Sequence, residues 1–371
     1  MIRDMHRNFL AAILFALPLF GQPAAVEWHT LPWDRVEVDG LPWYQENKGE
    51  FLRLPLRVQE AVPAAVWNLA HSPSGARIRL RTDSRLLSVR LEYPSPPNMR
   101  NMHAFGQTGV DAYVNGIYLG TAIADQDAKP GKVYEHQFFD FRDRPKENRE
   151  ITLYLSLYKP VKVLAIGLDR DAAVARAAPF AVPRPVVFYG TSITQGGCAS
   201  RPGMSYQAIL GRALNLDFVN LGFSGAGKGE PAVASAVAEI DAACFVLDFA
   251  QNNKAVDSLR EVYDPFLQTL RNRHADTPIV AITPIASARE VPGGPPDERI
   301  EAMRRLIRDV VTRRISQGDR HLQLVEGTDL LGPGRLDGLV DGVHPNDLGF
   351  QWMADDLGRR LMEVLRLTPH P

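Results

Sequence analysis

The sequence predicts a chain of two parts, an all-β half followed by an α/β half built on a five-stranded parallel sheet. Residues 27–170 consist of short β-like runs with turn residues between them and almost no helical periodicity. Residues 186–366 instead alternate five apolar strand-like runs with five helical stretches, and a small, proline-rich segment separates the two patterns. The 371 residues, 45% hydrophobic and 23% charged, are enough for two domains with separate cores.

The pattern divides the chain into four segments. We expect a signal peptide at residues 1–25, a β-sandwich domain at 26–171, a linker at 172–184 and an α/β domain at 185–371.

The first 25 residues are typical of a secretory signal peptide. Arg3 and Arg7 precede an apolar run at 9–20, and small residues with a proline follow at 21–25. The run is shorter than the roughly 20 apolar residues that a transmembrane helix needs. We therefore expect a periplasmic or secreted protein that begins near Val26 after cleavage and has no membrane contact; an uncleaved anchor is the alternative.

The charge balance argues against a polyanionic partner. The chain contains 42 Lys and Arg residues and 43 Asp and Glu residues, and its formal net charge is −1. Nucleic acid and anionic membranes bind through an excess of basic residues. We expect neither as a partner.

Five runs in the first half indicate strands, at residues 76–82, 86–93, 109–115, 133–141 and 149–157. Alternation in the first and last of these runs predicts half-buried antiparallel strands with their polar side chains outward. Asn115-Gly116 lies between two such runs, and both residue types tolerate the positive φ of a tight hairpin turn. The first half is therefore predicted to be an all-β sandwich or jelly roll.

The second half predicts strands at residues 186–189, 218–221, 244–249, 279–283 and 322–325, with helices at 204–214, 231–240, 257–273, 296–317 and 346–366. Apolar strands separated by helices indicate a parallel sheet covered on both faces. Binding sites in such sheets lie outside the carboxyl ends of the strands, so the residues just after each strand are the candidates for chemistry. The arginine-rich run at 304–314 is interpreted as the solvent-exposed face of a helix.

The two cysteines, Cys198 and Cys244, are expected to be free thiols. Cys244 begins one predicted strand, whereas Cys198 follows the end of a neighbouring one, which places them at opposite ends of the sheet. The histidines and cysteines show no metal-ligand spacing such as HxxxH or CxxC, so we expect no metal and no cofactor.

Four stretches carry candidate site residues. Ser192 follows the first strand on a tight turn, where it is either a nucleophile or a helix cap. The glycine-rich residues 222–229 follow the second strand, and their backbone amides can approach a ligand closely unless the loop is merely flexible. Their spacing matches neither a P-loop nor a dinucleotide fingerprint.

The other two stretches are polar. Asn252 and Asn253 follow the third strand and could donate to an oxyanion or cap a helix. Near the end of the chain, Asp341 lies three residues before His344. An aspartate so placed can hold the imidazole's tautomer while the other ring nitrogen takes a serine proton, although a surface loop pair is the alternative.

Together, in this order, the four stretches resemble the SGNH, or GDSL-type, hydrolase family over residues 185–367. The resemblance implies a flavodoxin-like three-layer sandwich. It also implies Ser192 as the nucleophile, His344 as its base and Asp341 as the orienting acid. The amides of Ser192 and Gly225 and the side chain of Asn252 would form the oxyanion hole.

The chain departs from the family pattern at two places. GTS replaces GDS around Ser192, and AQNN replaces the GxND block, which leaves a choice between Asn252 and Asn253. In the first half, residues 109–113 (GVDAY) resemble the GxDLY signature of a domain that precedes some bacterial SGNH hydrolases, with Ala112 in place of leucine. Asp111 of this motif is expected to make a turn or strand-end hydrogen bond, substrate contact being the alternative.

The resemblance and the export signal predict a serine esterase that removes short acyl groups, such as acetyl, from a carbohydrate. Residues 284–296 are expected to wall the acyl pocket, and they offer no long apolar surface for a fatty chain. The substrate would be a small-molecule or polysaccharide ester. A lipid, thioester or aryl-ester hydrolase and a non-enzymatic glycan-binding module are the alternatives. Four aromatic residues could pack between the halves or stack on sugars, namely Trp28, Trp33, Trp43 and Tyr44.

Overall fold

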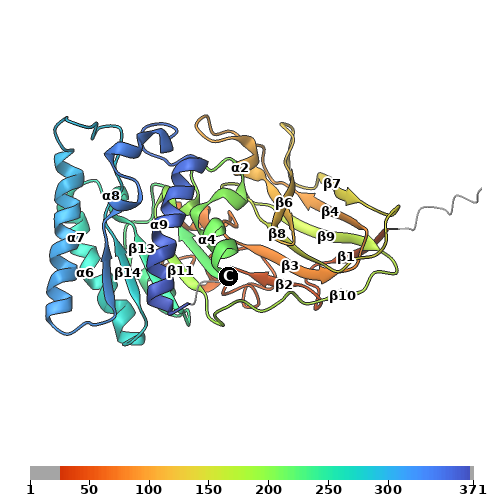
Figure 1. Cartoon of the computed structure of the whole chain (residues 1–371), viewed down its shortest axis with the longest axis horizontal. Helices are drawn as coiled ribbons and strands as arrows, with labels where there is room; N and C mark the ends of the chain where they lie inside the picture. Colours follow the sequence, from red (N-terminus) through yellow and green to blue (C-terminus); the bar gives the residue numbers. More distant parts are fainter. Residues whose placement is uncertain (1–25, 368–371) are drawn as a thin grey trace, which may run out of the picture.

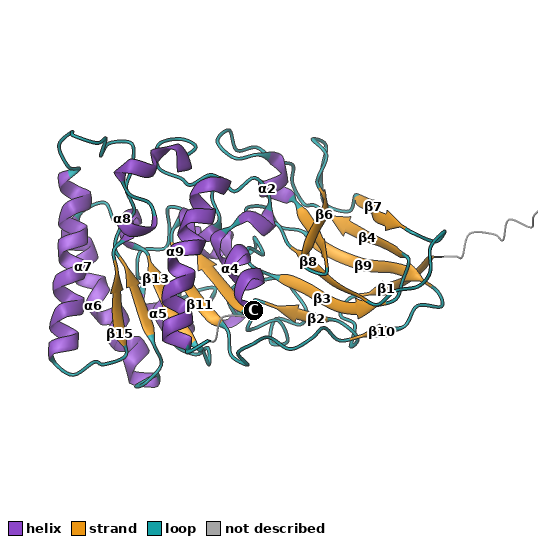
Figure 2. Ribbon diagram, in the orientation of Figure 1, coloured by secondary structure: helices purple, strands orange, loops and turns teal. Residues whose placement is uncertain are grey.

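A computed structural model describes residues 26–367 of the protein. The predicted signal peptide, residues 1–25, lies outside the described residues. The β half and the α/β half lie side by side along the long axis of the molecule, as Figure 1 shows. In Figure 2 the strands of the β half lie at the right and the long helices at the left.

The β half is a sandwich of two antiparallel sheets, as predicted. One sheet has the strand order β1-β9-β4-β7, and the other has the order β10-β3-β8-β5-β6 with β2 beside β3. Apolar side chains of both sheets, such as Ile78, Val89 and Ile151, form the core between them. The strands are β1 (Val26–Thr30), β2 (Glu37–Asp39), β3 (Arg77–Thr82), β4 (Leu86–Glu92), β5 (Val110–Val114), β6 (Ile117–Ala122), β7 (Val133–Asp140), β8 (Arg149–Tyr154), β9 (Lys162–Asp169) and β10 (Val174–Ala175).

Local details of the β half both match and extend the sequence prediction. Asn115 and Gly116 have φ values of 50° and 77° between β5 and β6, as a tight hairpin turn requires. Short helices absent from the prediction are η1 (Leu56–Val58), α1 (Ala64–Ala70) and α2 (Ala104–Thr108). The segment predicted as a linker contains β10, which pairs with β3.

The α/β half is built on a five-stranded parallel sheet of order β12-β11-β13-β14-β15. Its strands are β11 (Val186–Gly190), β12 (Phe218–Gly222), β13 (Cys244–Asp248), β14 (Ile279–Ile282) and β15 (Leu322–Val325). Its helices are α3 (Ser192–Gln195), η2 (Pro202–Met204), α4 (Tyr206–Leu214), α5 (Pro231–Val237), η3 (Ala250–Asn252), α6 (Val256–Arg273), α7 (Glu298–Ser316), α8 (Gly327–Leu330), η4 (Pro333–Gly338) and α9 (Asp347–Leu365).

Helices cover both faces of this sheet. Val187 and Tyr189 of β11 belong to a core that includes side chains of α5, α6 and α7. Val186 and Phe188, which point the other way, belong to a core with α4 and α9. The result is the predicted three-layer sandwich, in which the central strands are apolar on both sides. No helix of residues 26–367 has the length and apolar character needed to cross a bilayer.

The two halves share a polar, buried interface that alternation alone did not predict. Arg77 and Arg79 of β3 were expected to face solvent, but they are only 1% and 8% exposed. Arg77 pairs with Asp217 and lies over the Phe218 ring at 4.0 Å, because the α/β half covers this face of the strand. Within the run at 304–314, Arg305 and Arg313 are exposed as predicted, but Arg304 is buried against Glu290 at 2.5 Å.

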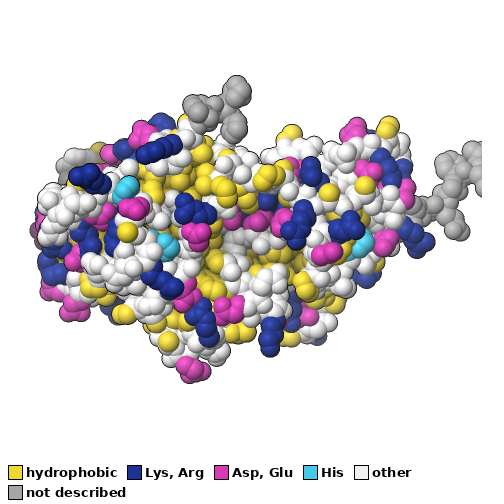
Figure 3. Space-filling model, turned by 90° about the horizontal axis from the view of Figure 1, so that it is seen from below, with side chains coloured by type: hydrophobic (Ala, Val, Ile, Leu, Met, Phe, Trp, Pro, Cys, Tyr) yellow, Lys and Arg dark blue, Asp and Glu magenta, His cyan; other side chains and the backbone are white. Residues whose placement is uncertain are grey.

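Asp111 of the GVDAY motif is buried at the same interface. Its Oδ2 accepts from Arg201 Nη1 at 3.0 Å and from the Gly203 amide at 2.8 Å, while Oδ1 accepts from the Thr121 hydroxyl at 2.6 Å. Asp111 therefore ties β5 to the chain just after α3. Elsewhere on the surface, basic and acidic side chains are interspersed, as the face in Figure 3 shows.

Arg53 is the most buried of these interface cations, with no exposed surface. It donates from Nε to Ser72 O at 2.7 Å and from Nη2 to Leu69 O at 2.8 Å. From Nη1 it reaches Asn220 O at 3.2 Å and Gly222 O at 2.5 Å, at the end of β12. Burial lowers the pKa of Arg53 to about 9, so the side chain keeps its charge at neutral pH.

We predict that Arg53→Ala lowers the free energy of unfolding by about 3 kcal/mol or more, because it removes four hydrogen bonds from a buried, charged donor at the interface of the two halves. Urea unfolding of the purified protein measures the loss. The matched control is Arg57→Ala, since Arg57 is half exposed and forms surface ion pairs with Glu46 and Glu239. That change should cost less than about 1 kcal/mol. Equal effects of the two substitutions would contradict this view of the interface.

Candidate active site

The sheet brings three of the candidate stretches to one edge. In the register of the sheet, Gly190 at the end of β11 pairs with Gly222 of β12 and with Asp248 of β13. The carboxyl ends of these parallel strands therefore lie at one level. The serine turn, the glycine loop and the asparagine pair follow these ends directly.

Ser192 is the first residue of the short helix α3. The helix is capped by Thr191, whose hydroxyl accepts from the Ile193 amide at 3.3 Å. The interpretation of Ser192 as the N-cap is therefore wrong, because the preceding residue fills that position. The Ser192 hydroxyl instead lies 2.9 Å from Nε2 of His344.

Asp341 and His344 form a compact loop just before α9. Oδ1 of Asp341 accepts from the amides of Val343 at 3.1 Å and His344 at 2.9 Å. Oδ2 lies 2.8 Å from Nδ1 of the His344 ring. The structure thus aligns the side chains of Ser192, His344 and Asp341 in one hydrogen-bonded chain.

The protonation state of this chain follows from its partners. Burial alone would raise the pKa of Asp341, but hydrogen bonds from Asn101, from the His344 amide and from the His344 ring hold it well below its usual range. An ionised carboxylate can only accept, so Nδ1 of His344 carries the ring proton. Nε2 is then free to accept the proton of the Ser192 hydroxyl.

The glycine loop makes a tight turn beside Ser192. The amides of Ala226 and Gly227 both donate to Phe223 O, at 3.0 and 2.8 Å. Gly225 has a φ of +65° at the turn, a conformation that favours glycine. Within residues 26–367, the backbone amides of Ser192 and Gly225 have no hydrogen-bond acceptor.

Asn252 and Asn253 have different surroundings. Nδ2 of Asn252 donates to Phe223 O at 3.1 Å and to Gly227 O at 3.0 Å, and so holds the glycine loop. Asn253 is 3% exposed, and its Nδ2 makes only long contacts of 3.4 Å with Lys228 O and Phe249 O. Both side chains therefore contact the glycine loop, but Asn252 makes the shorter bonds and makes them on either side of Gly225.

The β half also contributes to this site, which the sequence did not indicate. Nδ2 of Asn101 donates to Oδ2 of Asp341 at 2.9 Å, and the Tyr158 hydroxyl donates to Ser192 O at 3.3 Å. Neither residue belongs to a recognisable motif. Their positions follow from the way the two halves pack, for which a single sequence carries no signal.

Both cysteines are free, as predicted, and both are buried. Sγ of Cys198 lies within a group with Asp341 and His344 whose ligand atoms are all within 4.8 Å of one another. Burial, with the charge of Asp341, raises the pKa of Cys198 to about 12, and its S–H donates to Asn101 O at 3.0 Å. Cys198 is thus a thiol at neutral pH.

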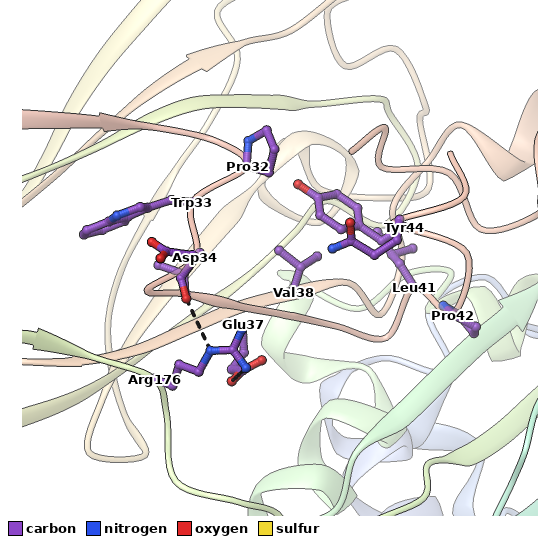
Figure 4. A pocket seen from close by; sticks show the side chains of 11 residues that line it. Pro32, Trp33, Asp34, Glu37, Val38, Leu41, Pro42, Tyr44 and Arg176 are labelled. Atoms are coloured by element: carbon purple, nitrogen blue, oxygen red, sulfur yellow. Dashed lines mark hydrogen bonds and ion pairs between the residues drawn. The ribbon is translucent and has the colours of Figure 1, made fainter. Parts of the chain in front are cut away.

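Two cavities are lined by residues that the sequence marks as candidates for ligand contact. One, of about 160 Å³, is lined by the neighbours of the triad, Ile193 and Val343, together with Ile285 and Ile300. The other, of about 580 Å³, lies in the β half and is shown in Figure 4. Trp33 and Tyr44 line this second cavity, whereas Trp43 is buried in the core beside α5 and α6.

Comparisons with known proteins agree with this geometry. Residues 183–362 match the model of the GDSL-like lipase/acylhydrolase family, and residues 26–174 match the model of the N-terminus of SGNH-hydrolase-type esterases, named GxDLY. A comparison with curated proteins found no match.

Solved structures share this fold. A protein of Bacteroides ovatus described as a GDSL-like lipase is 29% identical, with a TM-score of 0.81 over 94% of this chain and 100% of that one. A salicylyl-acyltransferase from a tetracycline biosynthetic pathway is 23% identical, with a TM-score of 0.77 over 94% and 99%. A family two carbohydrate esterase from Clostridium thermocellum, in complex with cellohexaose, is 17% identical, with a TM-score of 0.59 over 79% and 93%.

The last two likenesses show the fold alone, but the family models extend over both halves. The chain belongs to the GDSL-type, or SGNH, hydrolases and carries the GxDLY domain at its N-terminal side.

Proposed function

We propose that this protein is an exported serine esterase that removes short acyl groups, such as acetyl, from a carbohydrate. The observation that carries the proposal is the chain from Ser192 Oγ to His344 Nε2 at 2.9 Å and from His344 Nδ1 to Asp341 Oδ2 at 2.8 Å. A serine alcohol becomes an effective nucleophile when a positioned base takes its proton.

The reaction would run through an acyl-enzyme. His344 takes the hydroxyl proton as Ser192 Oγ bonds to the ester carbonyl carbon, and the carbonyl oxygen becomes an oxyanion. When the tetrahedral intermediate collapses, the bond to the alcohol oxygen breaks and His344 gives its proton to that oxygen. Water then attacks the acyl-enzyme with the same base, and the acid and free Ser192 are released.

Three donors are available for the oxyanion. The amides of Ser192 and Gly225 have no competing acceptor in the described chain, which favours both as donors. Asn252 is the third, but both protons of its amide are directed at Phe223 O and Gly227 O. To serve the oxyanion, Asn252 must share or release one of these bonds while the other keeps the loop in place.

The cavity beside the triad favours a small acyl group. Its volume of about 160 Å³ is close to the roughly 150 Å³ cavity known to hold one benzene molecule. Its wall at Ile285 is held by Arg304, which donates to Ile285 O at 3.0 Å and to O of the preceding Pro284 at 2.9 Å. A wall fixed in this way resists widening, so long acyl chains should fit poorly.

A carbohydrate alcohol and export are supported less directly. The predicted signal peptide would place the protein outside the cytoplasm, and the fold is shared with family two carbohydrate esterases. The same residues would also serve a lipid, thioester or aryl-ester hydrolase, and an inert domain would leave only glycan binding. Substrate assays separate these alternatives.

We predict that Ser192→Ala reduces ester hydrolysis to background while the protein keeps its melting temperature. Wild-type protein should prefer acetyl over butyryl and longer nitrophenyl esters, and should release acetate from acetylated polysaccharides. Equal rates for wild type and variant would contradict the catalytic assignment. A preference for long chains would contradict the short-acyl assignment, and release from nitrophenyl esters alone would contradict the carbohydrate assignment.

The two asparagines should respond differently to truncation. Asn252→Ala is predicted to lower kcat by about 10²–10³-fold, the loss found for a missing side-chain oxyanion donor. Asn253→Ala, the matched control, should retain most of kcat and mainly lower the melting temperature, because that side chain is buried. Steady-state kinetics on an acetyl ester decides the matter, and a larger loss of kcat in Asn253→Ala would reverse the assignment.

A further inference from the structure

A loop of the β half reaches the acid of the triad. Asn101 lies just before α2, and its Nδ2 donates to Oδ2 of Asp341 at 2.9 Å. The same oxygen faces Nδ1 of His344 at 2.8 Å. Asn101 and Asp341 are 240 residues apart in the chain, so this contact exists only when the two halves are packed together.

The loop that carries Asn101 is held on the side of the β half by a single buried side chain. Oε1 of Gln107, which is 2% exposed, accepts from the amides of Asn98 at 2.8 Å and Met99 at 2.9 Å. Its Nε2 donates to Met99 O at 3.1 Å and to Met102 O at 2.6 Å. The backbone on both sides of Asn101 is therefore held by contacts within the β half, independently of the triad.

The α/β half holds the same loop from the other side. The thiol of Cys198, six residues after the nucleophile, donates to Asn101 O at 3.0 Å. Asn101 is thus bonded to the α/β half through its backbone carbonyl and through its side chain. Gln107 and Cys198 hold the backbone of this loop independently of each other, and the Asn101 amide is thereby directed at Asp341. The side chain of Asn101 itself is exposed.

Asn101 supplies a second hydrogen bond to Oδ2 of the Asp341 carboxylate. Oδ1 of Asp341 already accepts two backbone amides, which set its position but leave Oδ2 with only the imidazole. A second donor on Oδ2 stops the carboxylate from turning about its terminal torsion, which is otherwise broad. It also favours the ionised form that the ring proton of His344 needs.

We propose that Asn101 is a positioning residue: it fixes the Asp341 carboxylate so that His344 keeps its productive tautomer and orientation. The β half would then complete the active centre instead of serving only as a separate binding module. This inference rests on the proposed role of Ser192 as the nucleophile.

The experiment compares wild type with Asn101→Ala and Asn101→Asp on an acetyl ester. Both variants lose the donor, and we expect kcat to fall about tenfold in Asn101→Ala, the value of a charge-assisted hydrogen bond in a partly exposed site, with KM unchanged. Asn101→Asp should fall further, because it places a second carboxylate against Asp341. In that variant the acid limb of the kcat profile should move to higher pH, since two carboxylates favour the protonated imidazole.

The other titratable groups that face Asp341 should not shift the acid limb of the kcat–pH profile. Besides His344, these are Cys198 and Tyr158, and burial raises the pKa of both. Asn98→Ala is the matched control, because Asn98 is an exposed asparagine of the same loop whose contact with Gln107 uses only its backbone. It should behave as wild type.

A double-mutant cycle tests whether Asn101 acts through Asp341. In an Asp341→Ala background, Asn101→Ala should have no further effect on kcat, because the group it positions is gone. Independent, multiplicative losses would overturn the proposal, as would a rise in KM with kcat unchanged, which would indicate a substrate contact instead. Wild-type rates in both Asn101 variants, with Ser192→Ala inactive, would refute the positioning role alone, whereas activity in Ser192→Ala would refute the proposed function itself.

Discussion

The site depends on the register of three parallel strands. Gly190 of β11 pairs with both Gly222 of β12 and Asp248 of β13, so the three strands end at one level. The residues that follow are delivered to the same edge of the sheet, with helices packed on both faces to hold the register. A slip by one residue would turn every side chain of a strand to the opposite face and would misplace the loop behind it. The positions of the residues at the strand ends therefore depend on the apolar packing of the parallel sheet against its helices.

The buried polar contacts between the halves extend this constraint to the β-sandwich. Arg53 binds the carbonyl ends of β12, and Asp111 binds the chain after α3. A buried guanidinium is costly unless its donors are matched, and here backbone carbonyls from both halves supply the acceptors. The β half is thus joined to the end of β12 and to η2, the short helix that follows the serine turn. Asn101 makes the same join at the opposite loop, beside Asp341.

Periodicity and strand-end position predicted much of the structure from sequence. The β-sandwich, the parallel sheet of the second half and the hairpin at Asn115 are confirmed, because the type of each element follows from a pattern within a short segment of sequence. The rule that strand ends converge also led to Ser192, whereas the spacing of Asp341 and His344 and the family resemblance led to His344; the structure places Ser192 and His344 in hydrogen-bond contact. The burial of Arg77 and Arg304 and the approach of Asn101 were not predicted. Each of these depends on a partner surface, and alternation in one segment does not reveal what covers its polar face.

The central claim is that His344 and Asp341 make Ser192 an activated nucleophile, and covalent trapping tests it most directly. The protein would be treated with a fluorophosphonate, which phosphonylates activated serines with loss of fluoride, and analysed by intact mass and peptide mapping. We predict one adduct per chain, located on Ser192, absent from Ser192→Ala and formed at least about a hundredfold more slowly in His344→Ala. An adduct on another residue, or wild-type labelling no faster than that of His344→Ala, would contradict the account.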